Sequence, residues 1–188
     1  MKGVNDALII VCNPSKFVFF LICFENDKQK PDNVGFDKRD QLKLFDFGLV
    51  KELHESDRTE NGMYKLTGMT GALRYMAPEV YFWKPYDLSV DVYSWSMIMW
   101  YILALEPPFG LYTHHMIEDR VIQRGSRPAI FSVWSSTLSN LMKQCWDVDP
   151  MSRPSFSDIC SVLKNEVTIE SEIDTTVASG GSSTPDNN

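Results

Sequence analysis

A long apolar run at residues 88–105 restricts the possible folds of this chain more than any other stretch. It is apolar on all sides of a helix, which is typical of a helix that is buried all round or that crosses a membrane. The part after Asp91 is short of the ~20 residues that a membrane span needs, and it contains Ser94 and Ser96. Residues 106–110, Glu-Pro-Pro-Phe-Gly, then end the helix. The run therefore predicts a buried helix at the centre of a domain.

The composition supports one globular domain. The chain has 188 residues, of which 44% are hydrophobic and 12% aromatic, and such proportions are typical of a domain with a core. Its net charge of −7 disfavours nucleic acid and anionic membranes as partners. Cys12, Cys23, Cys145 and Cys160 show no Cys-x-x-Cys spacing, so we expect reduced thiols rather than zinc ligands or disulfides. A cytoplasmic or nuclear protein is the expectation.

Three regions differ in sequence texture. Residues 1–29 contain two apolar runs that differ from the sequence of the rest of the chain. Residues 30–167 form the expected folded domain. Residues 168–188 are rich in Ser, Thr and Gly and are expected to be a disordered tail.

The N-terminal segment allows more than one interpretation. Its apolar runs, 7–12 and 17–24, are separated by Pro14 and are each too short to span a membrane. A cleaved signal peptide is one reading, although no small-residue cleavage site follows Phe24. In another reading, the segment is the translation of a T-rich intron that ends just before the codon for Lys30. This reading fits the composition of the segment better. We expect this segment to pack poorly against the domain.

Regular elements are expected at several further places. Residues 41–45 read as a short strand, and residues 51–70 are polar and loop-like. Helices are predicted at 115–124, 133–145 and 155–167, the last of them starting at a Ser155 or Ser157 cap.

Short motifs in a fixed order carry the functional signal. They are Lys30-Pro31-Asp32-Asn33, Phe45-Asp46-Phe47-Gly48 and Ala77-Pro78-Glu79, followed by Asp91, Trp146 and Arg153. Each motif alone is common by chance, but together and in this order they resemble those of protein kinases. The resemblance covers residues 30–166. Residues 76–79 and 145–156 look most like the tyrosine-kinase-like group.

This resemblance implies a protein-kinase-like α+β fold, of which the chain holds mainly the α-helical C-lobe with short strands. The sequence contains no Gly-x-Gly-x-x-Gly loop and no Val-Ala-x-Lys strand, so the N-lobe is expected to be absent. For the complete kinase, the implied reaction is phosphoryl transfer from Mg-ATP to a serine or threonine hydroxyl of a protein substrate.

The resemblance also implies roles for individual residues. Asp46 and Asn33 would hold Mg²⁺, and Phe47 and Gly48 would complete the motif beside bound ATP. Lys30 matches the lysine with which serine/threonine kinases contact the transferred phosphate.

Three further residues are implied to be structural. Glu79 and Arg153 would form a buried ion pair that joins the activation segment to the last helices. Asp91 would accept hydrogen bonds from the catalytic-loop backbone.

Thr67 and Thr70 are the candidate regulatory phosphosites because they lie nearest Ala77-Pro78-Glu79. A phosphate in this segment would be expected to order it against basic residues.

One position departs from the kinase pattern. Where the catalytic loop carries the aspartate that acts as base, this chain has Lys28, a cation at neutral pH and a poor proton acceptor. With neither base nor N-lobe, the chain as written is predicted to be inactive. The alternative interpretation is a pseudokinase-like module that binds partners and catalyses nothing.

Overall fold

The computed structural model describes residues 34–39, 42–44 and 53–166. Segments 1–29 and 168–188 lie outside these residues, so the expectations about them stay predictions. Each helix that the structure describes is too short or too polar to span a bilayer.

A small antiparallel hairpin begins the described part. β1 (Val34–Phe36) pairs with β2 (Leu42–Leu44), with Val34 opposite Leu44 and Phe36 opposite Leu42. The strand predicted at 41–45 is confirmed at its centre. Its partner β1 was not predicted, because three residues with a central glycine carry too little alternation to register as a strand.

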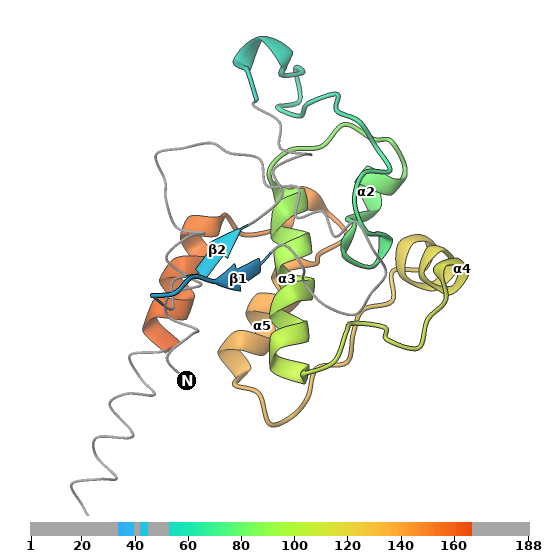
Figure 1. The fold of residues 1–188 in the computed structure, drawn as a ribbon. Helices are drawn as coiled ribbons and strands as arrows, with labels where there is room; N and C mark the ends of the chain where they lie inside the picture. Colours follow the sequence, from blue (N-terminus) through green and yellow to red (C-terminus); the bar gives the residue numbers. More distant parts are fainter. Residues whose placement is uncertain (1–33, 40–41, 45–52, 167–188) are drawn as a thin grey trace, which may run out of the picture.

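The helix α3 (Ser89–Ala104) lies at the centre, with the other helices around it (Figure 1). From Val90 to Trp100 every residue except Trp95 is buried, as the apolar run predicts. Both serines in this stretch are satisfied: Ser94 Oγ donates to the Tyr75 carbonyl at 2.9 Å and Ser96 Oγ to the Tyr93 carbonyl at 2.6 Å. Buried hydroxyl groups need such partners.

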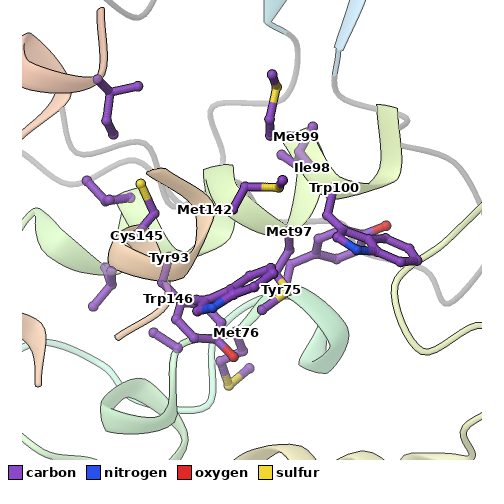
Figure 2. Close-up of a cluster of buried hydrophobic side chains, with 14 of the residues drawn as sticks. Tyr75, Met76, Tyr93, Met97, Ile98, Met99, Trp100, Met142, Cys145 and Trp146 are labelled. Atoms are coloured by element: carbon purple, nitrogen blue, oxygen red, sulfur yellow. The ribbon is translucent and has the colours of Figure 1, made fainter. Parts of the chain in front are cut away.

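The main core forms where α3 meets two other parts of the chain. Figure 2 shows Tyr93 and Met97 of α3 among Tyr75 from the preceding segment and Met142 and Cys145 from α5. Tyr93, Met97 and Cys145 have no exposed surface. Burial raises the pKa of the Cys145 thiol to about 12, so this cysteine is a packing residue.

The last turn of α3 departs from the prediction of burial on all sides. Ile102 is 46% exposed and Leu105 is 88% exposed. Leu105 adopts a left-handed conformation with φ of 57° and ends the helix, its N–H donating to the Tyr101 carbonyl at 2.9 Å. The sequence could not reveal this exposure, because the run stays apolar to its final residue.

The region predicted as a helix at 115–124 is helical but not wholly α. A short α4 (His114–Met116) continues into a π-helix, Ile117–Gln123, whose Ile117, Val121 and Ile122 are buried. The wider π turn places the neighbouring Val121 and Ile122 on the same buried face.

The C-terminal helices follow the prediction more closely. α5 (Ser136–Cys145) begins at Ser135, whose Oγ accepts from the Leu138 N–H at 3.1 Å. It starts three residues later than the predicted 133–145 because Phe131 and Trp134 form a turn that packs on Trp100. Within the described residues, the remaining helices are α2 (Pro78–Tyr81), the helix at 156–166, and 3₁₀ turns at Glu55–Asp57, Leu73–Tyr75 and Pro150–Ser152.

The expectation for the cysteines is wrong at one position. Cys145 is a free thiol, but Cys160 is disulfide-bonded. Sequence spacing does not show which distant cysteines meet in space.

Ser155 caps the last helix, and its replacement gives a test of this end of the fold. Its Oγ accepts from the Asp158 N–H at 3.2 Å, and its own N–H and Oγ donate to Asp158 Oδ2 at 3.0 and 2.6 Å. Ser155→Ala should destabilise the protein by about 1 kcal/mol at pH 7 in urea unfolding, the usual cost of losing an N-cap.

The same variant should show a pH dependence. The hydrogen bonds from Ser155 lower the pKa of Asp158 from its ordinary 3.8, so their contribution is present above pH 3.8 and lost as pH falls through the lower folded value. The stability difference between wild type and Ser155→Ala should therefore narrow between pH 5 and pH 2. A difference that stays constant would show that the cap does not depend on the Asp158 charge.

Candidate functional site

Some of the predicted site residues lie among the residues that the structure describes, and others lie outside them. The structure describes Thr67, Thr70, Glu79, Asp91 and Arg153. The implied cofactor-binding and catalytic-loop residues lie outside the described residues, and their roles stay predictions; they are Lys28, Lys30, Asn33, Asp46, Phe47 and Gly48.

Glu79 and Arg153 form the buried ion pair that the resemblance implied. Arg153 Nη1 lies 2.6 Å from Glu79 Oε1, and Nη2 donates to Oε2 at 3.1 Å. Such a two-point contact is the strong geometry for a guanidinium and a carboxylate. The two residues are 6% and 7% exposed, so the pair is removed from water.

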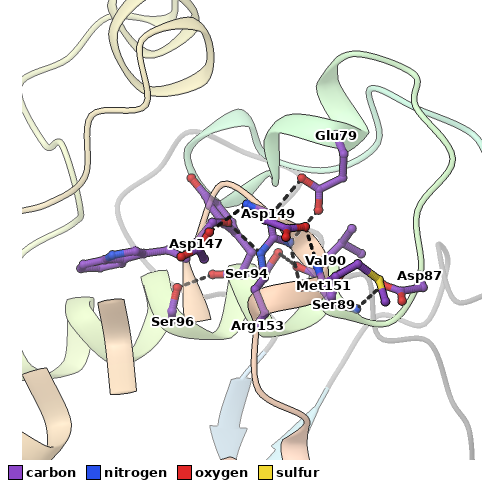
Figure 3. A network of polar contacts seen from close by, with 12 residues as sticks. Glu79, Asp87, Ser89, Val90, Ser94, Ser96, Asp147, Asp149, Met151 and Arg153 are labelled. Carbon is purple, nitrogen blue, oxygen red and sulfur yellow. Dashed lines mark hydrogen bonds and ion pairs between the residues drawn. The ribbon is translucent and has the colours of Figure 1, made fainter. Parts of the chain in front are cut away.

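Arg153 also holds the surrounding backbone (Figure 3). Its Nη1 donates to the Ser89 carbonyl at 3.0 Å, and its Nε donates to the Asp147 carbonyl at 3.0 Å. One side chain thus joins α2, the start of α3 and the loop after α5.

Asp91 lies in the first turn of α3 and is 2% exposed. The turn before it is fixed by Asp87, whose Oδ1 accepts from the Ser89 N–H at 2.9 Å. Hydrogen bonds from the catalytic-loop backbone to Asp91 stay a prediction, since that loop lies outside the described residues.

Sequence reasoning missed Arg127, which lies beside Arg153 at the Tyr93 ring. Its guanidinium and that of Arg153 each lie 5.2 Å from the centre of the Tyr93 ring. Arg127 Nε donates to the Trp146 carbonyl at 3.0 Å, so it ties the loop after the π-helix to the end of α5. Burial raises the pKa of Tyr93, although the two arginines act in the opposite direction. Nothing in the local Ser-Arg-Pro sequence indicates that the Arg127 side chain packs on Tyr93.

The segment with the two threonines is held against residues 80–86, and we call residues 64–71 the clamped segment. Tyr64 and Tyr86 exchange backbone hydrogen bonds of 2.9 and 3.1 Å, and the Met69 N–H donates to the Val80 carbonyl at 3.0 Å. Gly68 allows the close approach, because a Cβ there would lie 2.8 Å from both the Val80 oxygen and the Trp83 ring.

A second attachment follows the clamped segment. The Arg74 guanidinium donates to the carbonyls of Pro108 and Phe109 in the loop that ends α3. Residues 64–79 are therefore fixed at several points along their length rather than only at Glu79.

The described residues contain no group of three His, Cys, Asp or Glu side chains placed to hold a metal ion. The implied Mg²⁺ ligands, Asn33 and Asp46, carry the amide and carboxylate oxygens that Mg²⁺ prefers, so their chemistry fits the ion.

The buried pair gives a testable stability difference. Arg153→Met should destabilise the protein by about 3–5 kcal/mol in urea unfolding, because Glu79 is left charged, buried and unpaired. The double variant Glu79→Leu with Arg153→Met should recover part of that loss.

Arg124→Met is the matched control, since Arg124 pairs with Asp119 at 3.0 Å but is 71% exposed. Its cost should stay below about 1 kcal/mol. Equal costs for Arg153→Met and Arg124→Met would show that burial of the Glu79 pair contributes nothing.

Comparison with known proteins agrees with this geometry. The family model for the protein kinase domain matches residues 29–163. The serine/threonine-protein kinase VIK of Arabidopsis thaliana is 41% identical over 138 residues, which cover 72% of this chain and 31% of VIK. The serine/threonine-protein kinase STY17 of the same plant is 36% identical over 134 residues, covering 71% of this chain and 22% of STY17.

A relative from another lineage matches to a similar extent. The dual specificity protein kinase shkB of Dictyostelium discoideum is 36% identical over 132 residues, covering 69% of this chain and 19% of shkB. The matched part thus spans less than a third of the length of these relatives. The extent of the family match, together with the resemblance of the motifs, shows that this chain belongs to the protein kinase family.

Proposed function

We propose that this chain supplies the C-lobe part of a serine/threonine protein kinase, which transfers the γ-phosphoryl group of Mg-ATP to a hydroxyl of a protein substrate. The observation that carries the proposal is the buried Glu79–Arg153 pair. The pair fixes the Glu79 end of the segment that follows Asp46-Phe47-Gly48 in the sequence, and in the proposed kinase this segment would lie beside the site of transfer. The serine/threonine and dual-specificity relatives support this reaction class.

The proposed chemistry relies on positioning and charge. Bound Mg²⁺ would neutralise negative charge on the transferring phosphate, and Asp46 and Asn33 are the residues that would hold it. Lys30 would contact the phosphate, and its presence favours serine or threonine over tyrosine as the acceptor. Phe47 and Gly48 would shape the backbone beside ATP. Asp91 would support the catalytic loop from the start of α3.

A specific observation favours a second candidate function. Lys28 stands at the position of the catalytic base, and a lysine with an ordinary pKa of about 10.4 is protonated at neutral pH. A chain with this residue keeps the fold and the buried pair but lacks the proton acceptor for the substrate hydroxyl. The alternative is therefore a non-catalytic, pseudokinase-like binding module.

A phosphotransfer assay tests whether the chain as it stands has catalytic activity. We expect the purified 188-residue protein to transfer no detectable phosphate from radiolabelled ATP and Mg²⁺ to a generic protein substrate, because Lys28 cannot act as the base. An active protein kinase in the same buffer serves as positive control. Transfer that is present in the wild type and lost in Asp46→Ala would contradict this expectation and establish catalysis.

Transcript sequencing across the codons for Gln29 and Lys30 addresses the origin of Lys28. A mature transcript that joins His-Arg-Asp-Leu in frame to Lys30 would support a catalytic kinase. A mature transcript that encodes residues 1–29 as printed would support the non-catalytic module.

A further inference from the structure

The two arginines of the site bind neighbouring carbonyl groups in the loop after α5. Arg127 Nε donates to the Trp146 carbonyl at 3.0 Å. Arg153 Nε donates to the carbonyl of the next residue, Asp147, at the same distance of 3.0 Å (Figure 3). Both guanidinium groups lie 5.2 Å from the centre of the Tyr93 ring, which has no exposed surface. The ring and the loop are therefore each held by both arginines.

The two arginines differ in their negatively charged partners. Arg153 has the Glu79 carboxylate 2.6 Å from its Nη1. Arg127 forms no ion pair with any carboxylate among the described residues. Its Nη1 donates to the Ser126 carbonyl at 3.0 Å and to the Val121 carbonyl at 3.4 Å, and its buried Nη2 has no partner within the same part of the chain. A half-buried cation without a carboxylate is costly, so packing alone does not account for Arg127.

Arg127 supplies what an apolar side chain of similar volume could not. Its planar fork of donors binds three backbone carbonyls, one of them in the π-helix and one just after α5. Its positive charge is attracted to the aromatic ring of Tyr93. Arg153 lies against the same ring and binds the same loop. Arg127 therefore fixes both of the surfaces on which Arg153 lies.

We propose that Arg127 is a positioning residue for the Glu79–Arg153 pair. By fixing the Tyr93 ring and the loop after α5, Arg127 directs the two Nη groups of Arg153 toward the Glu79 carboxylate. The consequence for phosphoryl transfer rests on the proposed function: in such a kinase, loss of Arg127 would loosen the Glu79 end of residues 64–79 beside the site of transfer.

A double-mutant cycle in urea unfolding of the full 188-residue protein tests whether Arg127 acts through the pair. Arg127→Met should raise the equilibrium constant for unfolding in the wild type. In the background Glu79→Leu with Arg153→Met there is no pair to position, so the same change should raise that constant at least about five-fold less. A role confined to the hydrogen bonds that Arg127 itself makes would give the same effect in both backgrounds.

Arg120→Met is the matched control for an arginine on a tyrosine ring. The Arg120 guanidinium lies 5.4 Å from the centre of the Tyr112 ring, is exposed, and makes no hydrogen bond or ion pair to Glu79 or Arg153. Its replacement should change the unfolding constant by the same factor in both backgrounds.

Tyr93→Phe separates the ring of this residue from its hydroxyl. The hydroxyl is buried and has no hydrogen-bond partner among the described residues, whereas the ring contacts both arginines. The coupling between Arg127 and the pair should therefore be the same in Tyr93→Phe as in the wild type.

Hydrogen exchange of the Arg153 side chain, measured by NMR, separates positioning from overall stability. Arg127→Lys keeps the positive charge but lacks the planar fork, so exchange of the Arg153 Nη hydrogens should accelerate. This acceleration should exceed that of the Ile159 amide, which is bonded to the Ser155 carbonyl in the last helix and reports global opening, by at least about five-fold. Because Arg127→Lys is conservative, this measurement decides the question if a variant of the cycle does not fold.

Three results would overturn the proposal. An equal effect of Arg127→Met in both backgrounds would show that Arg127 acts independently of the pair. Unchanged exchange at Arg153 in Arg127→Lys would show that the fork does not hold the pair, and equal acceleration at Arg153 and Ile159 would show an effect on global stability only. Neither readout involves phosphotransfer, so an inactive chain leaves both tests intact, and a failed test leaves the proposed function intact.

Discussion

The buried pair between Glu79 and Arg153 is the constraint on which the rest of the site depends. Two opposite charges removed from water are tolerable only when each faces the other and the remaining donors are used. Arg153 meets this condition by also bonding the carbonyls of Ser89 and Asp147. Because each of those bonds belongs to a different part of the chain, the pair fixes the relative positions of α2, α3 and the loop after α5.

The attachments of the site become weaker with distance from this pair. Glu79 is held by charge in a dry environment, whereas the clamped segment is held by backbone bonds, one tyrosine hydroxyl and the partly exposed Thr70. Segments that open locally come from such weakly held parts of a structure. A rigid base at Glu79 with a weaker stretch at residues 64–71 allows the conformation of these residues to change while the core stays intact.

Sequence reasoning succeeded where the environment of a residue is determined by residues close to it in the sequence. The apolar run predicts α3, and a cap at Ser155 or Ser157 predicts the last helix, which begins at Ser155. The ordered motifs identify the family, and the resemblance implies the partners Glu79 and Arg153. Sequence reasoning failed where the environment of a residue depends on parts of the chain that are distant in the sequence. Arg127 stacks on Tyr93 without any local signal, Ile102 is exposed at the end of a run that stays apolar, and the disulfide of Cys160 depends on chain path.

The separation of the paired charges along the chain has a consequence for synthesis. Glu79 and Arg153 are 74 positions apart, and the Ser89 carbonyl that Arg153 also binds is 64 positions from it. During translation, at roughly 5–20 residues per second, Glu79 therefore leaves the ribosome several seconds before its partner exists. Throughout that interval α2 carries a carboxylate that cannot yet be buried. The order of events is fixed by chain connectivity: α3 and α5 can form first, and the Glu79 end of residues 64–79 is paired with Arg153 afterwards.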